Sequence, residues 1–532
     1  MADEAIYTAV TFAPVQGFIE KSRKLRDLYG ASEILSYLSK KIIDAATESG
    51  VEVISPGLPN IEQGTPNRIL IKGNFPESQA RETLLSGWKE VMEHCRKWID
   101  DNLRHLGPYY WENKWNHWIN HSWEIFWAQG NCPTSAMKEL ENNKLGRNWV
   151  GINWIGESSS MTGADGIAFP GLGGIERNPM NISYKQEKNQ IEEFYTALAT
   201  ITESTTTPEV EGKFIDPSEK LSIPELTKRL VTLPDIAKRF GMSSLSEGLG
   251  IQRKPERSTG TPAQWTGWFM GDGDKVGNHL QNIAIREGDI GLKQFSEAMR
   301  NWGNNFTDNF SNNVEGIRGK VIYAGGDDFL GVIYSRKPQN PIPAFTAYEW
   351  LMTLNDRWEQ HEQSITLSVG FVWVAGSVPQ RDVLQHCREA EKLAKSLGRN
   401  RVTIRVLFNS GQYVQWTCPW NYLHILKRYR DRNGNTYEKW ECHGRDEKYK
   451  PNWNHIYSDL AQLKARHAID LNPEKQNIDD TLALALFNIY FDDRDYLIQN
   501  SSHIVGNRDS YLEIICWIND LINVGWQLCT DI

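Results

Sequence analysis

The chain has 532 residues, which exceeds the usual size of one hydrophobic core, so we expect about three to four domains. Its 58 Lys and Arg residues against 67 Asp and Glu residues give a net charge of −9, which argues against a free-standing nucleic-acid binder that works by bulk positive charge. The first residues are acidic and no apolar run approaches about 18 residues, so we expect no signal peptide, no membrane partner and a cytoplasmic location.

The pattern of residues 1–132 predicts a first α+β domain. The expected elements are a strand over 6–12, a helix over 17–47, strands over 51–55 and 68–72, a helix over 77–103 and a strand over 123–129. This βαββαβ order is the ferredoxin-like pattern. The opening strand has no pair of acids, and the stretch Ser55-Pro-Gly-Leu-Pro-Asn60 stands where an acidic hairpin would be. We therefore expect this domain to be non-catalytic.

Two further segments have mainly helical patterns. Residues 133–262 hold many glycines and a Thr- and Glu-rich stretch, with helices expected over 184–201 and 223–240, which predicts a mostly helical middle domain. Residues 411–532 predict a helical C-terminal domain. Its helices are expected near 420–430, 453–468, 479–490 and 509–528.

Residues 263–410 predict a second copy of the βαββαβ plan. The expected elements are a strand over 266–274, a helix over 291–312, a β-hairpin over 320–335, a helix over 343–361, a strand over 365–374, a helix over 379–397 and a strand over 401–408. The predicted fold class is therefore α+β, with two ferredoxin-like domains of the palm or cyclase type, a helical middle domain and a helical C-terminal domain.

The hairpin over 320–335 places two acids at its tip. Gly325 and Gly326 are expected to supply the positive φ angles of a tight turn, and Asp327 and Asp328 follow directly. Two carboxylates about 4 Å apart repel by roughly 4 kcal/mol at an effective dielectric constant near 20. Such a tip needs a cation, a raised pKa or full solvation. Taken alone, it fits a solvated turn as well as a site.

A second pair of acids lies upstream, at Asp272 and Asp274. Their spacing of two places both side chains on the same face of an extended strand. If this strand pairs beside the hairpin, Asp272 converges with Asp327 and Asp328. Oxygen ligands of this kind suit two Mg²⁺ or Mn²⁺ ions, and the arrangement fits metal-assisted phosphoryl transfer.

These motifs carry a family resemblance. The segments Gly271-Asp-Gly-Asp-Lys-Val-Gly277 and Gly325-Gly-Asp-Asp328 resemble the catalytic palm of nucleotidyl cyclases and polymerases. Together with the segment Phe12–Ser36, they resemble the large subunit (Cas ten, Cmr-two type) of type III-B CRISPR effector complexes. The resemblance covers about the first 75 residues and 262–410. Relatives often have an N-terminal nuclease domain with a His-Asp pair. This chain has no His-Asp dipeptide, so we expect a variant without that domain.

The resemblance implies a function and a set of partners. It implies an RNA-guided antiviral complex that converts ATP into cyclic oligoadenylate by 3′–5′ nucleotidyl transfer when target RNA is bound. The other subunits, crRNA and target RNA would be the partners of the chain. Relatives often hold zinc through cysteines in the middle region, but Gly163–Phe169 and its neighbours offer no cysteine, so we expect no zinc.

The resemblance also assigns site residues. Asp272, Asp327 and Asp328 are expected to be both the catalytic residues and the metal ligands. The residues expected to bind nucleotide are Gly273, Asp274, Lys275, Gly325, Gly326, Lys395 and Arg399. From the sequence alone, Lys395 and Arg399 also fit an ordinary helix end with basic residues. Two alternatives stay open, namely a stand-alone cyclase using GTP or ATP and a non-catalytic scaffold subunit.

Overall fold

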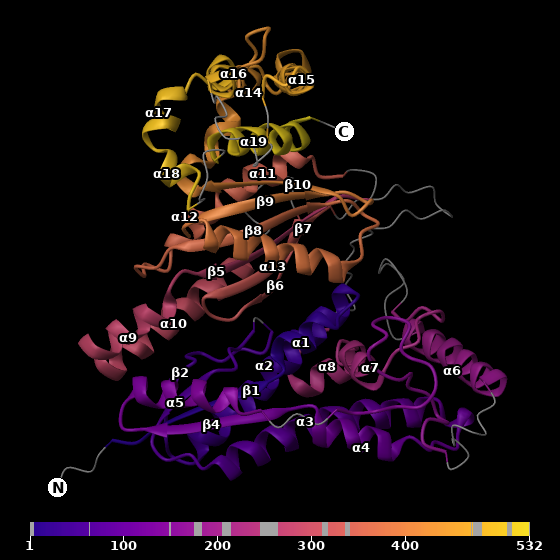
Figure 1. Cartoon of the computed structure of the whole chain (residues 1–532). Helices are drawn as coiled ribbons and strands as arrows, with labels where there is room; N and C mark the ends of the chain where they lie inside the picture. Colours follow the sequence, from indigo (N-terminus) through magenta and orange to yellow (C-terminus); the bar gives the residue numbers. More distant parts are fainter. Residues whose placement is uncertain are drawn as a thin grey trace.

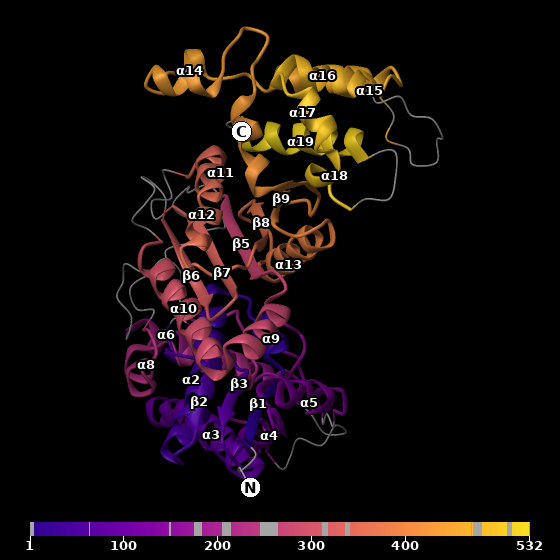
Figure 2. The same ribbon diagram turned by 90° about the vertical axis from the view of Figure 1, so that its left-hand side faces the viewer.

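The computed structural model of the chain has three tiers, which Figures 1 and 2 show from two directions. The N-terminal α+β half forms one end, a second sheet with its helices lies in the middle, and the C-terminal helices form the other end. The structure describes residues 5–62, 64–147, 151–174, 184–204, 214–244, 264–310, 318–335, 341–469, 471, 481–507 and 513–530.

The first sheet has four antiparallel strands in the order β2-β3-β1-β4. The strands are β1 (Tyr7–Ala13), β2 (Glu52–Ser55), β3 (Ile69–Lys72) and β4 (Glu124–Gly130). Its helices are α1 (Val15–Glu20), α2 (Leu25–Glu48), α3 (Glu77–Asn102), the short 3₁₀ turn at Arg104–Leu106 and α4 (Glu112–His121). The element order matches the predicted βαββαβ plan.

One prediction in this half needs correction, because the single helix expected over 17–47 is two helices. The Asp27 carboxylate accepts hydrogen bonds from the backbone N–H groups of Lys24 (3.0 Å) and Arg23 (3.3 Å). A side chain that satisfies these N–H groups starts a new helix at this point. The chain therefore turns between α1 and α2.

The first sheet is buried on both faces, because alternate residues of β1 pack on opposite sides. Val10 and Phe12 join the core formed with α2 and α3. Tyr7 and Ala9 instead share a core with Phe295 of the middle tier. One face of the first sheet is thus built against the second sheet's helices, and the two α+β halves are packed together.

The second sheet has six strands in the order β10-β9-β8-β5-β7-β6. The strands are β5 (Thr266–Gly273), β6 (Arg318–Ala324), β7 (Asp328–Tyr334), β8 (Leu367–Val374), β9 (Arg401–Leu407) and β10 (Tyr413–Pro419). Only β8 and β9 pair in parallel. The strands β8-β5-β7-β6 have the same order as the first sheet when the two sets are matched in sequence, so both halves share one topology.

The sheet extends past the predicted boundary at residue 410, because β10 pairs with β9. Its helices are α9 (Val276–Arg286), α10 (Gly288–Asp308), α11 (Ala344–Met352), α12 (Leu354–Glu359) and α13 (Gln380–Ser396). The sequence did not predict α9, which begins directly after the acidic segment. Glu287 lies between the two helices, and Gly288, the first residue of α10, has φ of +62°.

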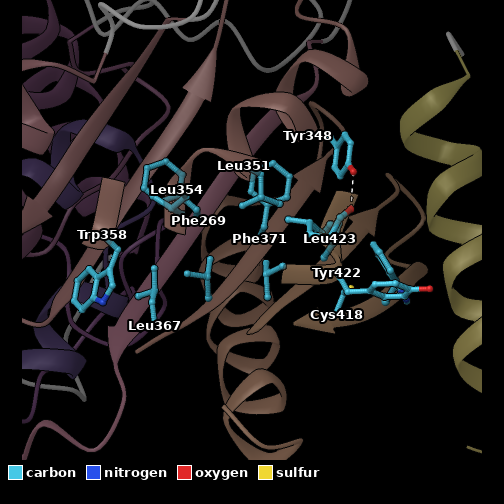
Figure 3. Close-up of a cluster of buried hydrophobic side chains, with 14 of the residues drawn as sticks. Phe269, Tyr348, Leu351, Leu354, Trp358, Leu367, Phe371, Cys418, Tyr422 and Leu423 are labelled. Atoms are coloured by element: carbon cyan, nitrogen blue, oxygen red, sulfur yellow. Dashed lines mark hydrogen bonds between the residues drawn. The ribbon is translucent and has the colours of Figure 1, made fainter. Parts of the chain in front are cut away.

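An aromatic core lies on one side of the second sheet. Figure 3 shows Phe269 of β5 near Phe371 of β8, with Leu351, Leu354 and Trp358 from the covering helices. The Tyr348 hydroxyl donates a hydrogen bond to the Leu423 carbonyl (2.6 Å). This contact ties the sheet's helices to the C-terminal region, which shares the same core.

Helices predominate in the remaining described segments, except for residues 151–174, which form turns and isolated β-bridges. The middle region has α5 (Pro133–Leu145), α6 (Tyr184–Ser204), α7 (Ile223–Leu230) and α8 (Pro234–Phe240). The single helix expected over 223–240 is divided because Pro234 starts a new helix. The C-terminal region has 3₁₀ turns at Trp420–Arg428 and Glu447–Tyr449, with α14 (Tyr437–Cys442), α15 (Asn454–Ala465), α16 (Thr481–Phe491), α17 (Arg494–Gln499), α18 (Ser501–Ile504) and α19 (Glu513–Cys529). Within the described ranges, every helix is too short or too polar to cross a membrane.

Candidate active site

The three acids expected to converge do meet at one end of the second sheet. Asp272 on β5 is the direct cross-strand partner of Asp328 on β7. The Gly273 N–H donates a hydrogen bond to the Asp327 carbonyl (2.8 Å), which fixes the hairpin tip against β5. Cross-strand partners have Cβ atoms about 4.5–5.5 Å apart. The pairing register therefore holds the carboxylates as close neighbours.

The acids destabilise one another's charged forms. Burial is the main cause that raises the pKa of Asp328, and the charges of Asp327 and Asp272 raise it further. Burial and the Asp272 charge also raise the pKa of Asp327. The Asp328 side chain is exposed at the tip and Asp327 is half-buried, so water relieves part of this effect. The cluster nevertheless favours binding of a proton or a cation.

A lysine already supplies one positive charge. The Lys395 ammonium, in the last turn of α13, forms an ion pair with Asp272 and a second one with Glu391 (2.5 Å). These pairs raise the pKa of Lys395 against the opposing effect of burial, so it stays charged. Burial still raises the pKa of Asp272, although the Lys395 ammonium opposes this effect. Lys395 thus lies at the acids, and its expected contact with nucleotide stays a prediction.

The three carboxylates are of the type that binds divalent cations, but they are not arranged around a common point as metal ligands. Among the described residues, no group of three His, Cys, Asp or Glu side chains is arranged to hold a metal ion. The Lys395 ammonium is paired with the Asp272 carboxylate. Three oxygen donors with raised pKa values still fit the chemistry of Mg²⁺ or Mn²⁺.

Asp274 lies on the same face as Asp272, as its spacing predicted. β5 ends at Gly273, but the Asp274 N–H donates to the Thr366 carbonyl (2.8 Å), and the Asp274 carboxylate reaches Ser368, which is the cross-strand partner of Asp272. The buried Asp274 carboxylate accepts hydrogen bonds from the Thr366 hydroxyl (2.9 Å), the Ser368 hydroxyl (2.7 Å) and the Asn400 N–H (2.9 Å). Asp274 therefore fastens the acidic segment to β8 and to the turn after α13.

Close packing constrains Gly273 but neither Gly325 nor Gly326. Neither Gly325 nor Gly326 has a positive φ, so the expectation of a positive-φ turn was wrong. Both lie beside Pro66 of the first half, where an added Cβ would only reach van der Waals contact. Gly273 is more constrained, because a Cβ there would lie 2.9 Å from Val276 and 3.2 Å from the Cβ of Asp327.

The acids face a cavity between the two halves. Its volume is about 330 Å³, and Asp272, Asp327 and Asp328 line one side of it. The first half lines the other side with Gln16, Ser32, Ser36, Thr65, Asn67 and Arg68. The charge of Arg68 also lowers the pKa of Asp327, which opposes the effect of burial. The first half thus contributes mainly polar groups with Arg68 and Glu20, whereas the second half contributes the three acids and Arg388.

Arg300 of α10 joins the two sides of this cavity, and sequence reasoning missed it. Its buried guanidinium donates to the carbonyls of Gly64 (2.5 Å), Ala324 (3.2 Å) and Gly325 (3.2 Å). One side chain therefore fixes the hairpin turn to the loop of the first half. A sequence signal exists, because Arg300 follows the buried Leu292 and Ser296 at a spacing of four along the inward face of the helix.

A second pocket of about 760 Å³ adjoins the acids on the side of Lys395. Of the residues expected to bind nucleotide, Asp274, Lys275, Lys395 and Arg399 all line it. Lys275 has φ of +57° and precedes α9, whose N-terminus opens beside the pocket. Helix N-termini and basic side chains both favour anions. The acids thus lie between the 330 Å³ cavity and the 760 Å³ pocket.

Two sequence families match this chain. "Cas10/Cmr2, second palm domain" matches residues 266–403, and "CRISPR-associated protein Cmr2, N-terminal" matches residues 7–93. No curated protein matches it.

Several solved structures have a similar fold. A chain in the cryo-EM structure of type III-B Cmr-beta in the apo state has 11% identity and a TM-score of 0.55, with 99% of this chain and 82% of that chain covered. Csm1 from T.onnurineus has 14% identity and a TM-score of 0.47, with coverage of 99% and 70%. Csm1 with Csm4, from a type III-A CRISPR-Csm complex, has 13% identity and a TM-score of 0.46, with the same coverage.

Proposed function

Since the chain belongs to the Cas10/Cmr2 family of type III CRISPR large subunits, we propose that its acidic site joins ATP molecules into cyclic oligoadenylate. One observation carries this proposal. Asp272 and Asp328 are cross-strand partners beside Asp327, and they face a cavity to which the other α+β half contributes polar groups. A site built from two halves of equal topology suits a reaction between two nucleotides.

The acids would hold two divalent cations at Asp272, Asp327 and Asp328. Such ions neutralise charge on the phosphates and lower the pKa of an attacking hydroxyl. The protein's part is to keep three mutually repelling carboxylates together. The β5–β7 register and the hydrogen bond from Gly273 to Asp327 perform that task.

Lys395 would exchange one partner for another during binding. In the structure its ammonium is paired with Asp272 and Glu391. With a cation at Asp272, the ammonium is free to contact phosphate oxygens in the adjoining pocket, which it also lines. Lys275 and Arg399 line the same pocket and would share the charge of the triphosphate.

The first half would place the second nucleotide. Ser36, Thr65 and Asn67 offer hydroxyl and amide groups across the cavity from the acids, and Arg68 adds a charge. Among the described residues of the first half, the one acid that lines this cavity is Glu20, which is paired with Arg388. In this proposal, the second half activates the attacking hydroxyl and the first half positions the second nucleotide.

The partners of the reaction are also proposed. The matched structures include a complex with Csm4 and a type III-B complex, and we propose that this chain likewise acts within a type III effector with crRNA and target RNA. The acidic balance of the chain fits this arrangement, because strong RNA capture by one subunit depends on Lys and Arg.

The test compares nucleotide conversion in three samples, namely the chain alone, the complex with guide RNA, and the complex with guide and matched target. Each is incubated with one labelled NTP and Mg²⁺. We expect cyclic adenylate products from ATP in the third sample only. Equal rates in all samples, or a preference for GTP, would favour a stand-alone cyclase. Absence of product from every NTP in the third sample would favour a scaffold subunit.

A further inference from the structure

The C-terminal region reaches the end of helix α13, beside the acids. The segment His503–Asn507, which includes the end of α18, packs on the residues that follow this helix. The Asn507 N–H donates a hydrogen bond to the Leu397 carbonyl (3.2 Å), and the Arg401 guanidinium donates one to the His503 carbonyl (3.0 Å). The two hydrogen bonds bracket the turn between Leu397 and Arg401.

Gly506 makes this close approach feasible. It has φ of +87°, and a Cβ at this position would lie 2.1 Å from the Leu397 carbonyl oxygen. No side chain fits at that distance without moving one of the two segments. The contact between the C-terminal segment and the turn is therefore built on a glycine.

The turn itself has an uncommon backbone. Gly398, Arg399 and Asn400 have φ of +124°, +66° and +50° in succession. Residues with side chains rarely adopt such angles, and two in a row persist only when surrounding contacts hold them. The hydrogen bonds to His503 and from Asn507 are contacts of this kind.

This turn matters because it reaches the acidic segment. The Asn400 N–H donates to Asp274 (2.9 Å), and the Arg399 guanidinium lies 3.9 Å from the same carboxylate. The side of the turn that faces the acids is thus fastened to Asp274, while its other side is fastened to the C-terminal segment.

Asn507 also lines the 760 Å³ pocket directly. Three basic side chains, Lys275, Lys395 and Arg399, line this pocket together with the amides of Asn278 and Asn282. The carboxylate of Asp274, which also lines it, is already engaged by hydrogen bonds from Thr366, Ser368 and Asn400. A space with several cations and N–H donors suits a polyphosphate.

We propose that the C-terminal segment His503–Asn507 forms a wall of the polyphosphate subsite, in which the Asn507 amide binds phosphate oxygen and Gly506 positions the turn. This inference rests on the proposed nucleotide chemistry of the acidic site. It assigns part of the nucleotide site to a region whose sequence gives no sign of chemistry.

The test uses the assembled complex with target RNA and the variant Asn507→Ala. Loss of one hydrogen bond to a charged group corresponds to about a tenfold rise in KM for ATP, and we expect kcat to stay within about twofold. The inhibition constant of a non-hydrolysable ATP analogue should rise in parallel, whereas that of AMP should not. Asn507→Gln, which keeps the amide, should recover part of the loss.

Asn500→Ala is the matched control, because Asn500 is an amide of the same region that donates only to the Tyr496 carbonyl in its own helix. It should leave both constants unchanged. Gly506→Ala should lower kcat, and thermal unfolding of the purified chain reports whether that variant is folded. Unchanged KM and inhibition constants for Asn507→Ala, in a complex that converts ATP normally, would overturn this inference alone. Failure of the wild-type complex to bind or convert ATP would instead overturn the proposed function.

Discussion

Asp272 and Asp328 stand directly opposite each other on neighbouring antiparallel strands, although 55 residues of chain separate them. Backbone pairing alone therefore fixes two carboxylates at one point, and Asp327 follows at the hairpin tip. The interval between their strands is filled by α9, α10 and β6, which build the supporting core. The fold thus holds a concentrated negative charge that an added cation would neutralise.

Lys395 tests the exchange of partners at Asp272. Lys395→Met should raise KM for ATP and lower kcat, because the variant loses a phosphate contact and leaves Asp272 without its cation. Lys395→Arg should retain part of the activity, since the charge remains. Steady-state kinetics of both variants measure this. Wild-type constants in Lys395→Met would show that the lysine only ends the helix.

Gly273 and Gly277 form a matched pair of glycines for testing the close packing of the tip. Gly273→Ala should reduce activity by about tenfold or more, because the new Cβ would press on Val276 and displace Asp327. Gly277→Ala should be neutral or slightly stabilising, since nothing lies within 4 Å of a Cβ there and alanine favours the helix. Equal activities of the two variants would contradict the packing argument.

The acids should make stability depend on pH. Their pKa values are raised in the folded chain, mainly by burial, so protonation of the site favours the folded state. In metal-free buffer, this stabilisation of the folded state is fully present below about pH 4. It is lost as the pH rises through the raised pKa values of the acids. Asp327→Asn with Asp328→Asn should flatten this dependence.

Thermal unfolding at pH 5 and pH 7.5, with EDTA and with Mg²⁺, measures the effect. Mg²⁺ should stabilise the wild-type chain more at pH 7.5, because the carboxylates are then ionised and free to bind it. An equal response of the wild-type chain and the double variant to Mg²⁺ at both values would argue against metal binding by these acids.

Arg300 tests the link between the two halves. Arg300→Met should destabilise the chain by about 2–4 kcal/mol, because the buried carbonyls of Gly64, Ala324 and Gly325 lose a shared donor. Arg286→Met, at an exposed arginine of α9, is the control and should change stability little. Denaturant unfolding compares the two. Equal free energies of unfolding would show that Arg300 does not stabilise the junction.

The sequence predicted the order and pairing of the strands better than the side-chain contacts between elements. Strands β5, β7 and β8 follow from short β-branched and aromatic runs bounded by glycine or polar residues, and their pairing brings the acids together as expected. The break after α1 was missed because it depends on Asp27 reaching back to Lys24. β10 was missed because the βαββαβ plan ends with β9, so the domain was expected to end at residue 410.

Long-range contacts explain most of the remaining differences. Arg300 and Asn507 contact residues far away in the chain. The spacing of Arg300 from Leu292 and Ser296 indicates the inward face of α10 but not which carbonyls it binds, and no local pattern marks Asn507. The spacing of Asp274 from Asp272 predicted their common face, but it did not predict the hydrogen bonds that Asp274 accepts from Thr366, Ser368 and Asn400, since only the fold brings these elements near. Side-chain networks of this kind depend on tertiary structure.

The most direct test of the account is product formation by the target-bound complex with Asp327→Ala and Asp328→Ala in the same chain. The control replaces two exposed neighbouring acids, Asp446→Ala with Glu447→Ala, which lie outside the site. With labelled ATP and Mg²⁺, the account predicts cyclic oligoadenylate from the wild-type and control complexes. It predicts a loss of several orders of magnitude in the Asp327 and Asp328 variant, while that complex still assembles. Full product formation by an assembled complex that lacks both acids would contradict the account.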